Sequence, residues 1–515
     1  MSEHILNNNN SNSINNIGPI EAESNVAEGS TMPPPDPPAY QEHQEEPHIE
    51  ARPEDGGDDE NDHEEQYGLD SMGNDELIRN IIAENDSKSP LHMAFMNMAN
   101  SILGAGIISQ PFAIKQAGVV GAFIVYILLG FIIDWTLRLI VQNLVISGTK
   151  TYQDSVEKAM GKKGKLLIMM ANGLFAFGGC VGFCMIMGDS IPHVLRTIIP
   201  DNYIERNWVI ICTTVFISLP LSLHRNIEAL EKASGLALVS MAIIVLTVTI
   251  RGPFLSQSLK SQVTLFHPKW WFRTSIFKSI SIISFALVCH HNTSFIYFSL
   301  KNKSIAKFTR LTHISCMLSV IICMTMGYFG FHVFKEKTKG NVLNNFPGDD
   351  NIINIARLFF GFNMLTTFPL EIFVLRNIVM DILNDTLLDT DYREINDMEN
   401  GDINNTDNTT LQEANVTKYH TIVTILLVLS TMGISLTTCN LGALFELIGS
   451  TTASIIAFIL PPLTNIILTN GTKHSIKERF SHYAVIIFGF MVMIISSSQT
   501  ILGSINNHDV KHCEL

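Results

Sequence analysis

Residues 97–111 read Asn-Met-Ala-Asn-Ser-Ile-Leu-Gly-Ala-Gly-Ile-Ile-Ser-Gln-Pro, and this stretch decides how the chain folds. It lies in an apolar segment, 92–115, long enough to cross a bilayer core, which takes about 20 helical residues. Gly104, Gly106 and Pro111 weaken that helix near its middle. An unwound stretch exposes backbone N–H groups that can hold a carboxylate and carbonyls that can hold a cation. The alternative is close helix packing, because small residues also mark helix–helix contacts.

Ten further apolar segments follow the first one. They span residues 119–146, 166–190, 207–223, 234–253, 274–300, 311–334, 353–380, 419–438, 441–468 and 482–504. Stretches such as 241–250 and 421–429 have no polar stripe, which argues against buried helices of a soluble protein. The sequence therefore predicts an all-α integral membrane protein of about 11 transmembrane helices.

The acidic residues are concentrated in two segments. The 515-residue chain has 34 Lys+Arg, 48 Asp+Glu and a net charge of −14, yet only 16% of its residues are charged. Residues 1–90 hold 22 of the acidic residues and residues 384–417 hold nine, so the rest of the chain is mildly basic. An apolar, basic body with two acidic segments argues against a nucleic-acid-binding protein, a secreted disulfide scaffold and an ordinary soluble enzyme.

Composition also suggests the domain organisation. Residues 1–90 are rich in Asn, Ser, Glu, Asp and Pro and lack a signal-peptide pattern, so they are expected to be a disordered acidic tail. The same composition makes 384–417 an acidic flexible loop within the transmembrane domain, 91–504, which a short tail, 505–515, follows. Alternate links between spans carry 16 and 11 Lys+Arg, which favours a cytosolic N-terminus and a cytosolic 384–417 loop. Glycosylation sequons in that loop, if used, would contradict this topology; they begin at Asn384, Asn404, Asn408 and Asn415.

The sixth segment carries a second interruption. Residues 284–294 read Ser-Phe-Ala-Leu-Val-Cys-His-His-Asn-Thr-Ser, with five consecutive polar residues from His290 onward. Spans one and six would correspond if the fold is two inverted five-helix repeats, and paired interrupted spans point to a transporter site. His290 and His291 have no carboxylate or cysteine set beside them, so no metal site is predicted. The eight cysteines show no metal spacing and no disulfide framework.

The eighth segment contains a possible cation site. Pro369 lacks an N–H group and frees a carbonyl one turn earlier, which the hydroxyls of Thr366 and Thr367 could complement as ligands for a small cation. Glu371 is a candidate proton carrier, because ionisable groups inside spans are costly and usually functional. The alternative is an ion pair of Glu371 with Arg357 or Arg376 in the same span.

Four ordered motifs resemble those of the amino acid/auxin permease family. They are Asn-x-x-Asn-Ser-Ile-Leu-Gly-Ala-Gly-Ile from residue 97, Val-Cys-His from 288, Thr-x-Pro-Leu-Glu-x-Phe-Val-Leu-Arg from 367, and Gly-Ser-Thr-Thr-Ala-Ser from 449 with Pro-Pro at 461. Within that family the chain is most similar to the vacuolar amino-acid transporters of yeasts and the sodium-coupled neutral amino-acid transporters of animals. The resemblance covers 91–504 and implies a LeuT-like fold of two inverted five-helix repeats plus one extra helix.

The resemblance also implies roles for individual residues. The substrate would bind to residues of the two interrupted spans, namely Asn97, Asn100, Ser101, Gly104, Ala105, Gly106, Ser284, Cys289 and His290. In the sodium-coupled branch of the family an Asn and a Thr hold the cation, and they correspond to Asn100 and Thr367 here. The candidate proton carrier inside the spans is Glu371, with a histidine as the alternative. The link between spans five and six is short and has no cysteine, which favours the vacuolar branch over the sodium-coupled branch.

Together these features predict a secondary active transporter of neutral L-amino acids in the vacuolar membrane, working by alternating access and driven by protons. The alternatives are a sodium-coupled importer at the plasma membrane and a non-transporting amino-acid sensor. No nucleophile–base pair or metal set occurs in the spans, so neither enzymatic activity nor a cofactor is expected.

The acidic tail contains a motif of its own. Residues 33–40 read Pro-Pro-Pro-Asp-Pro-Pro-Ala-Tyr, in which Pro37, Pro38 and Tyr40 form Pro-Pro-x-Tyr. This resembles a ligand for WW domains, whose aromatic grooves bind preformed polyproline II segments. In a cytosolic tail it implies recruitment of a WW-domain ubiquitin ligase. The alternative is a proline-rich linker.

Overall fold

Membrane-length helices make up most of the described chain. The computed structural model describes residues 88–198, 204–223, 234–261, 271–383, 407–470 and 476–506; Pro37, Pro38, Tyr40 and 384–406 lie outside them. Ten helices are long and apolar enough to cross a membrane, and a bent pair makes an eleventh if counted as one span. These eleven overlap the eleven segments expected from the sequence. The prediction of an all-α membrane protein of about 11 spans is therefore confirmed.

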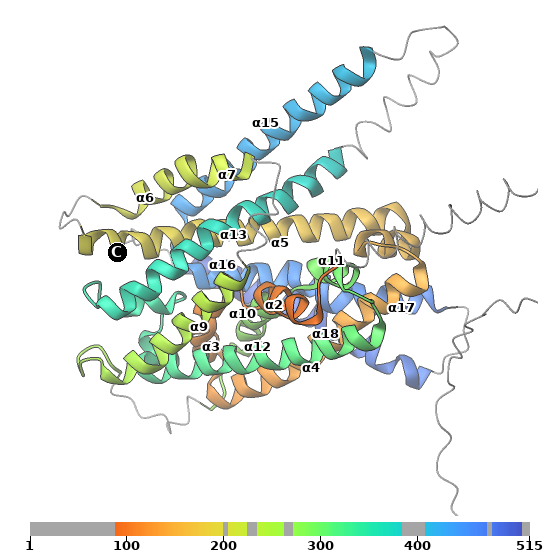
Figure 1. Cartoon of the computed structure of the whole chain (residues 1–515). Helices are drawn as coiled ribbons and strands as arrows, with labels where there is room; N and C mark the ends of the chain where they lie inside the picture. Colours follow the sequence, from red (N-terminus) through yellow and green to blue (C-terminus); the bar gives the residue numbers. More distant parts are fainter. Residues whose placement is uncertain are drawn as a thin grey trace, which may run out of the picture. The chain divides into compact units, whose positions relative to one another are not determined.

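The first six spans consist of helices whose α labels Figure 1 prints where there is room. Their bounds are α2 (Leu91–Ile102), η1 (Ala105–Ser109) and α3 (Gln110–Ala117) for span one; α4 (Val119–Ser147); α5 (Tyr152–Ile198); α6 (Arg206–Thr213), η2 (Thr214–Ser218) and α7 (Leu219–Leu223) for span four; α9 (Ser234–Arg251) with η3 (Gly252–Phe254); and α10 (Ile276–Leu287), η5 (His290–Asn292) and α11 (Thr293–Ser299) for span six.

The remaining five spans complete the bundle. They are α12 (Ile305–Phe334), which η6 (Lys335–Lys337) and η7 (Val342–Asn345) follow; α13 (Asn351–Leu383); α15 (Asp407–Thr437); α16 (Leu441–Ile448), η9 (Gly449–Ile459) and α17 (Leu460–Leu468) for span ten; and α18 (Ile476–Asn506). Figure 1 shows α2 in front of α10 in the middle of the view, and α13 lies along α5.

Span one is broken where the glycines predict it. The last backbone hydrogen bond of α2 is from the Leu103 N–H to the Ala99 carbonyl, at 2.8 Å. The two halves of the span then meet at a bend of 45°. Downstream, the Gln110 side-chain amide donates to the Gly106 carbonyl at 2.7 Å, and the Tyr126 hydroxyl donates to Gln110 Oε1 at 2.7 Å. These bonds hold the polar side chains of Gln110 and Tyr126 against the second half of the broken span, so that both find partners inside the bundle, as a bilayer interior requires.

Span six is broken beside span one. Helix α10 stops at Leu287, and the chain resumes as a single 3₁₀ turn, η5, before α11. A methyl group at Gly106 would lie 2.6 Å from the Ala286 Cβ, whereas one at Gly104 would meet nothing within 4 Å. The two interpretations of the span-one glycines therefore both apply: Gly106 permits close packing, and Gly104 borders open space.

Four local features differ from the sequence expectation or were not expected. Span ten contains an eleven-residue π-helix, η9, between two α-helical segments. Gly161 has a left-handed φ of 71° and separates a short helix from the membrane part of α5. Helix α15 begins at Asp407, so residues 407–417 of the expected flexible loop are helical. Cys439 is disulfide-bonded, although the sequence showed no disulfide framework.

The contact between η9 and α10 provides a test of this packing. We expect Gly449→Ala to lower the melting temperature of the purified protein, because a methyl group there would overlap the Ser281 backbone carbonyl. Overpacking of this kind costs about 1–3 kcal/mol. Gly433→Ala is the matched control, since Gly433 is exposed on α15 with nothing within 4 Å. Equal melting temperatures for the two variants would contradict the packing described.

Candidate functional site

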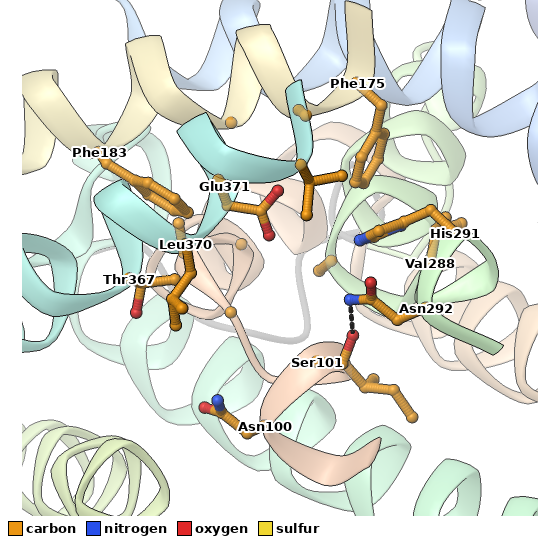
Figure 2. A pocket seen from close by; sticks show the side chains of 18 of the residues that line it. Asn100, Ser101, Phe175, Phe183, Val288, His291, Asn292, Thr367, Leu370 and Glu371 are labelled. Carbon is orange, nitrogen blue, oxygen red and sulfur yellow. Dashed lines mark hydrogen bonds between the residues drawn. The ribbon is translucent and has the colours of Figure 1, made fainter. Parts of the chain in front are cut away.

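A cavity of about 430 Å³ lies where spans one and six are interrupted (Figure 2). Residues of α2, η1, α5, α9, α10, η5, α11 and α13 line it, so both broken spans and three further helices form its walls. Its polar side chains are those of Asn97, Asn100, Ser101, His291, Asn292, Asn363, Thr367 and Glu371. The remaining lining is mainly apolar, as in most small-molecule sites.

All six span-one residues expected at a substrate site line this cavity. They are Asn97, Asn100, Ser101, Gly104, Ala105 and Gly106. The first backbone N–H groups of a helix and its last backbone carbonyls have no hydrogen-bond partner within the helix. At this break, these are the N–H groups at the start of η1 and the carbonyls at the end of α2. The break therefore offers backbone donors and acceptors within a few residues of each other, beside open space at Gly104.

The three span-six residues expected at the site lie outside its lining. Ser284, Cys289 and His290 are completely buried, and His290 Nε2 lies 2.8 Å from the Thr136 hydroxyl of α4. The cavity wall at this break consists instead of Val288, His291 and Asn292, as Figure 2 shows. The polar run located the break, but the path of the chain after Leu287 decides which of its side chains face inward.

A side-chain hydrogen bond connects the two breaks. The Asn292 amide donates to the Ser101 hydroxyl at 2.9 Å, the dashed line in Figure 2. Each residue comes from the interrupted part or the end of a half-helix, so the bond fixes one broken span against the other. Asn292 is a site residue that sequence reasoning located within the polar run but did not select.

Helix α13 supplies the other predicted residues. Thr367 and Glu371 lie one turn apart and both line the cavity, facing Asn100 and Ser101 of α2 across it (Figure 2). The helix is continuous through Pro369, and the Thr366 and Thr367 hydroxyls donate to the Asn363 carbonyl at 2.9 and 2.8 Å. A hydroxyl that donates a hydrogen bond still has acceptor lone pairs. The Thr367 hydroxyl can therefore also accept a hydrogen bond from a molecule in the cavity or coordinate a cation there.

Glu371 differs from the other carboxylates inside the described bundle. Asp134 pairs with Arg138 at 3.0 Å, Asp189 pairs with Arg206 at 3.0 Å, and Glu446 pairs with Lys278 at 3.3 Å. Within the described residues Glu371 has no such ion pair.

Neither arginine considered as a partner reaches Glu371. Arg357 donates to the carbonyls of Leu343, Phe346 and Pro347, and Arg376 donates to the Ser222 carbonyl and the Thr424 hydroxyl. The alternative interpretation of Glu371, as half of an ion pair with either arginine, is therefore not found in the described part of the chain.

An aromatic and aliphatic wall is the part of the site that sequence reasoning missed. The Phe175 ring centroid lies 5.5 Å from that of Phe285 and 5.2 Å from that of His291, and Phe183 lines the cavity one turn beyond Gly179. Met241, Phe295, Ile296, Met364, Leu370, Phe373 and Val374 complete this wall. Nothing in the sequence distinguishes these few side chains from the rest of the chain's 30 phenylalanines and from the many aliphatic residues of the spans.

The cavity combines backbone polar groups at the two breaks with a mainly apolar side-chain lining. Such backbone groups can bind both an anion and a cation. The lining contains no Lys or Arg, and the described residues contain no group of three His, Cys, Asp or Glu that could hold a metal ion.

Comparison with known proteins identifies the family. The model of the family described as transmembrane amino acid transporter protein matches residues 87–502. This chain belongs to that family. The resemblance noted from the four motifs is thereby confirmed. The prediction of an integral membrane protein related to amino-acid transporters is confirmed as well.

Individual relatives cover most of the chain. Vacuolar amino acid transporter 2 of Saccharomyces cerevisiae is 59% identical over 86% of this chain and 89% of its own length. The protein named "Putative sodium-coupled neutral amino acid transporter 11" of Danio rerio is 30% identical over 81% of this chain and 88% of its own length. Among solved structures, a manganese transporter of Eremococcus coleocola is 9% identical with a TM-score of 0.49, over 81% of this chain and 88% of that chain.

The two span-one glycines are predicted to respond differently to the same substitution. Gly104→Ala should reduce amino-acid flux in membrane vesicles several-fold without lowering the melting temperature, because the added methyl group enters the cavity beside the backbone donors. Gly106→Ala should lower the melting temperature, because the added methyl group meets Ala286. Flux and melting temperature are measured for both variants. Wild-type flux in Gly104→Ala would contradict the assignment of Gly104 to the cavity.

Proposed function

We propose that the chain is a secondary active transporter that moves neutral L-amino acids across the vacuolar membrane by alternating access, coupled to protons. The observation that carries this proposal is a cavity at two broken spans that contains one carboxylate without an ion-pair partner in the described chain. The 59% identity to a vacuolar amino acid transporter supports the membrane and the substrate class.

The breaks provide the binding groups for the amino-acid backbone. The substrate carboxylate would lie at the start of η1, where free N–H groups and the positive end of the half-helix favour an anion. The substrate ammonium group would lie toward the last carbonyls of α2 and α10, with the Ser101 hydroxyl nearby. These contacts are common to every amino acid and leave selectivity to the rest of the cavity.

The charge of the lining supports neutral substrates. A buried acidic side chain needs a cationic or hydrogen-bonding partner, and the lining includes no Lys or Arg. The apolar wall of Phe175, Phe183 and Phe285 instead offers favourable contact to an uncharged side chain.

Glu371 is the proposed proton carrier. An ionised carboxylate among mainly apolar lining residues is costly unless it is paired, so the group can take up a proton more readily than it can remain charged there. Binding and release of that proton on opposite sides of the membrane would link the substrate cycle to the proton gradient.

Direct uptake measurement tests this: amino-acid accumulation in vacuolar vesicles should collapse when an uncoupler is added.

Sodium coupling is the second candidate, since Asn100 and Thr367 both line the cavity from facing helices and carry oxygen ligands suited to a cation. A non-transporting sensor is the third. Replacing sodium by choline during uptake separates the first two, and substrate binding without flux would identify a sensor.

Substitution of Glu371 tests the coupling mechanism. Glu371→Gln should abolish the stimulation of uptake by a proton gradient while retaining amino-acid exchange at equilibrium, because the amide keeps the size of the side chain but not its proton. The matched control is Glu336→Gln, which removes a carboxylate that pairs with Arg273 outside the cavity. Persistent uncoupler sensitivity in Glu371→Gln would rule out this residue as the carrier.

The Pro-Pro-x-Tyr motif of residues 37–40 is proposed to recruit a WW-domain ubiquitin ligase from the cytosolic side. A pull-down with an isolated WW domain should recover the full-length protein and lose it on Tyr40→Ala, whereas Tyr67→Ala in the same acidic tail should have no effect. Equal recovery of both variants would leave the motif as a linker.

A further inference from the structure

A buried ion pair outside the cavity joins three spans. Lys278 Nζ of α10 lies 3.3 Å from Glu446 Oε1 of α16, and the Thr500 hydroxyl of α18 donates to the same oxygen. The Glu446 side chain is 4% exposed and that of Lys278 is 21% exposed. Ionisable groups inside a span are costly and usually functional, and the proposed substrate cycle does not use this pair.

Glu446 is held by fewer contacts than another paired carboxylate of the bundle. The Arg206 guanidinium donates to one oxygen of Asp189. The side-chain amides of Asn341 and Asn344 donate to the other oxygen of Asp189. Both donors to Glu446 reach Oε1, and among the described residues no hydrogen bond reaches Oε2. Oε2 is therefore the atom of this carboxylate that can take up a proton.

One face of α10 connects the pair to the cavity. Lys278, Ser281 and Phe285 are spaced by three and four residues, which places them on the same side of the helix. The Ser281 hydroxyl donates to the Ser496 hydroxyl of α18 at 2.8 Å. The Phe285 ring lines the cavity and stacks on Phe445 of α16, with ring centroids 4.2 Å apart. A movement of α10 away from α16 and α18 would therefore move a wall of the cavity.

The three residues of this contact lie toward helix ends on one side of the bundle. Lys278 is close to the start of α10, Glu446 is in the first half of α16, and Thr500 is in the last turns of α18. In the topology expected from the Lys and Arg count, these ends face the vacuolar lumen. In the proposed proton-coupled cycle, the lumen is the side with the higher proton concentration.

We propose that Glu446 is a regulatory proton site, separate from Glu371, and that its protonation releases α10 from α16 and α18 and so speeds transport. A proton from water on the lumenal side forms an O–H bond at Glu446 Oε2, while Lys278 keeps its own proton. The ion pair is then lost, and water hydrates the partly exposed ammonium group. The inference rests on the proposed function, in which α10 moves when the cavity opens.

The experiment measures exchange of a labelled neutral amino acid in proteoliposomes of the full-length protein. The pH is the same on both sides, so no gradient drives the exchange, and it is set to about 7.5 or about 5. The wild type should exchange several-fold faster at the lower pH. Glu446→Gln should exchange at the faster rate at both pH values, because an amide has the shape of the protonated acid and forms no ion pair with Lys278. Both proteins keep Glu371, so its own titration cancels in the comparison.

Two further variants act as controls. Lys278→Met should behave like Glu446→Gln, because a buried carboxylate that has lost its cation takes up a proton instead. Glu336→Gln should keep the wild-type dependence on pH, since Glu336 is half exposed and pairs with Arg273 in the links outside the spans. A wild-type pH dependence in Glu446→Gln, or slower exchange of that variant at both pH values, would overturn the inference.

The proposed function and this inference fail in different ways. If the wild type moves no amino acid, the transport proposal is wrong, and the proton site is then tested by the melting temperature of the purified protein. The ion pair stabilises the fold only while Glu446 is ionised. Glu446→Gln should therefore melt below the wild type at about pH 7.5 and together with it at about pH 5. A melting difference that is the same at both pH values would overturn the proton site.

Discussion

The contact of Gly106 with Ala286 is the constraint on which the rest of the structure depends. A helix interrupted inside a bilayer leaves backbone groups that lipid cannot satisfy. Two interrupted helices can tolerate this only where they face each other and a shared cavity. The absent side chain at Gly106 lets the breaks approach closely, while the Gln110–Gly106 and Asn292–Ser101 hydrogen bonds satisfy or fix groups beside them.

The polar groups of the described bundle follow from this arrangement. Carboxylates away from the breaks are paired, as Glu446 is with Lys278 and Asp189 with Arg206, because an unpaired charge among apolar helices is costly. Glu371 has no such pair in the described chain and instead faces the cavity. Backbone polar groups, one carboxylate and an apolar wall thus meet in a single space, and the proposed proton-coupled transport rests on that arrangement.

Most of the fold could be predicted from the sequence because the bilayer limits the possibilities. Span length, hydropathy and the cost of polar residues in lipid located eleven spans and the breaks in the first and sixth. Residues next to a break are adjacent in sequence as well as in space, so Asn97 to Gly106 could be placed at the cavity. Thr367 and Glu371 could be placed there because polar groups are rare in a span.

Other features depended on contacts between distant segments. The choice of His291 and Asn292 over His290 depends on the path of the chain after α10 and on Thr136 of α4, which binds His290. The π-helix of span ten and the helical start of α15 at Asp407 had no signal in the local pattern. The phenylalanines of the wall resemble those that face lipid, since both are apolar residues of apolar helices.

The sequence by itself determined that the chain crosses the membrane about eleven times, where it is interrupted, and which polar residues lie at the interruptions. These properties arise from the cost of placing each residue in lipid, which depends on that residue and its immediate neighbours. Only the tertiary structure decided which side chains share the cavity and that Gly179 borders space whereas Gly178 does not. Those properties depend on how helices far apart in the chain rotate and pack against one another.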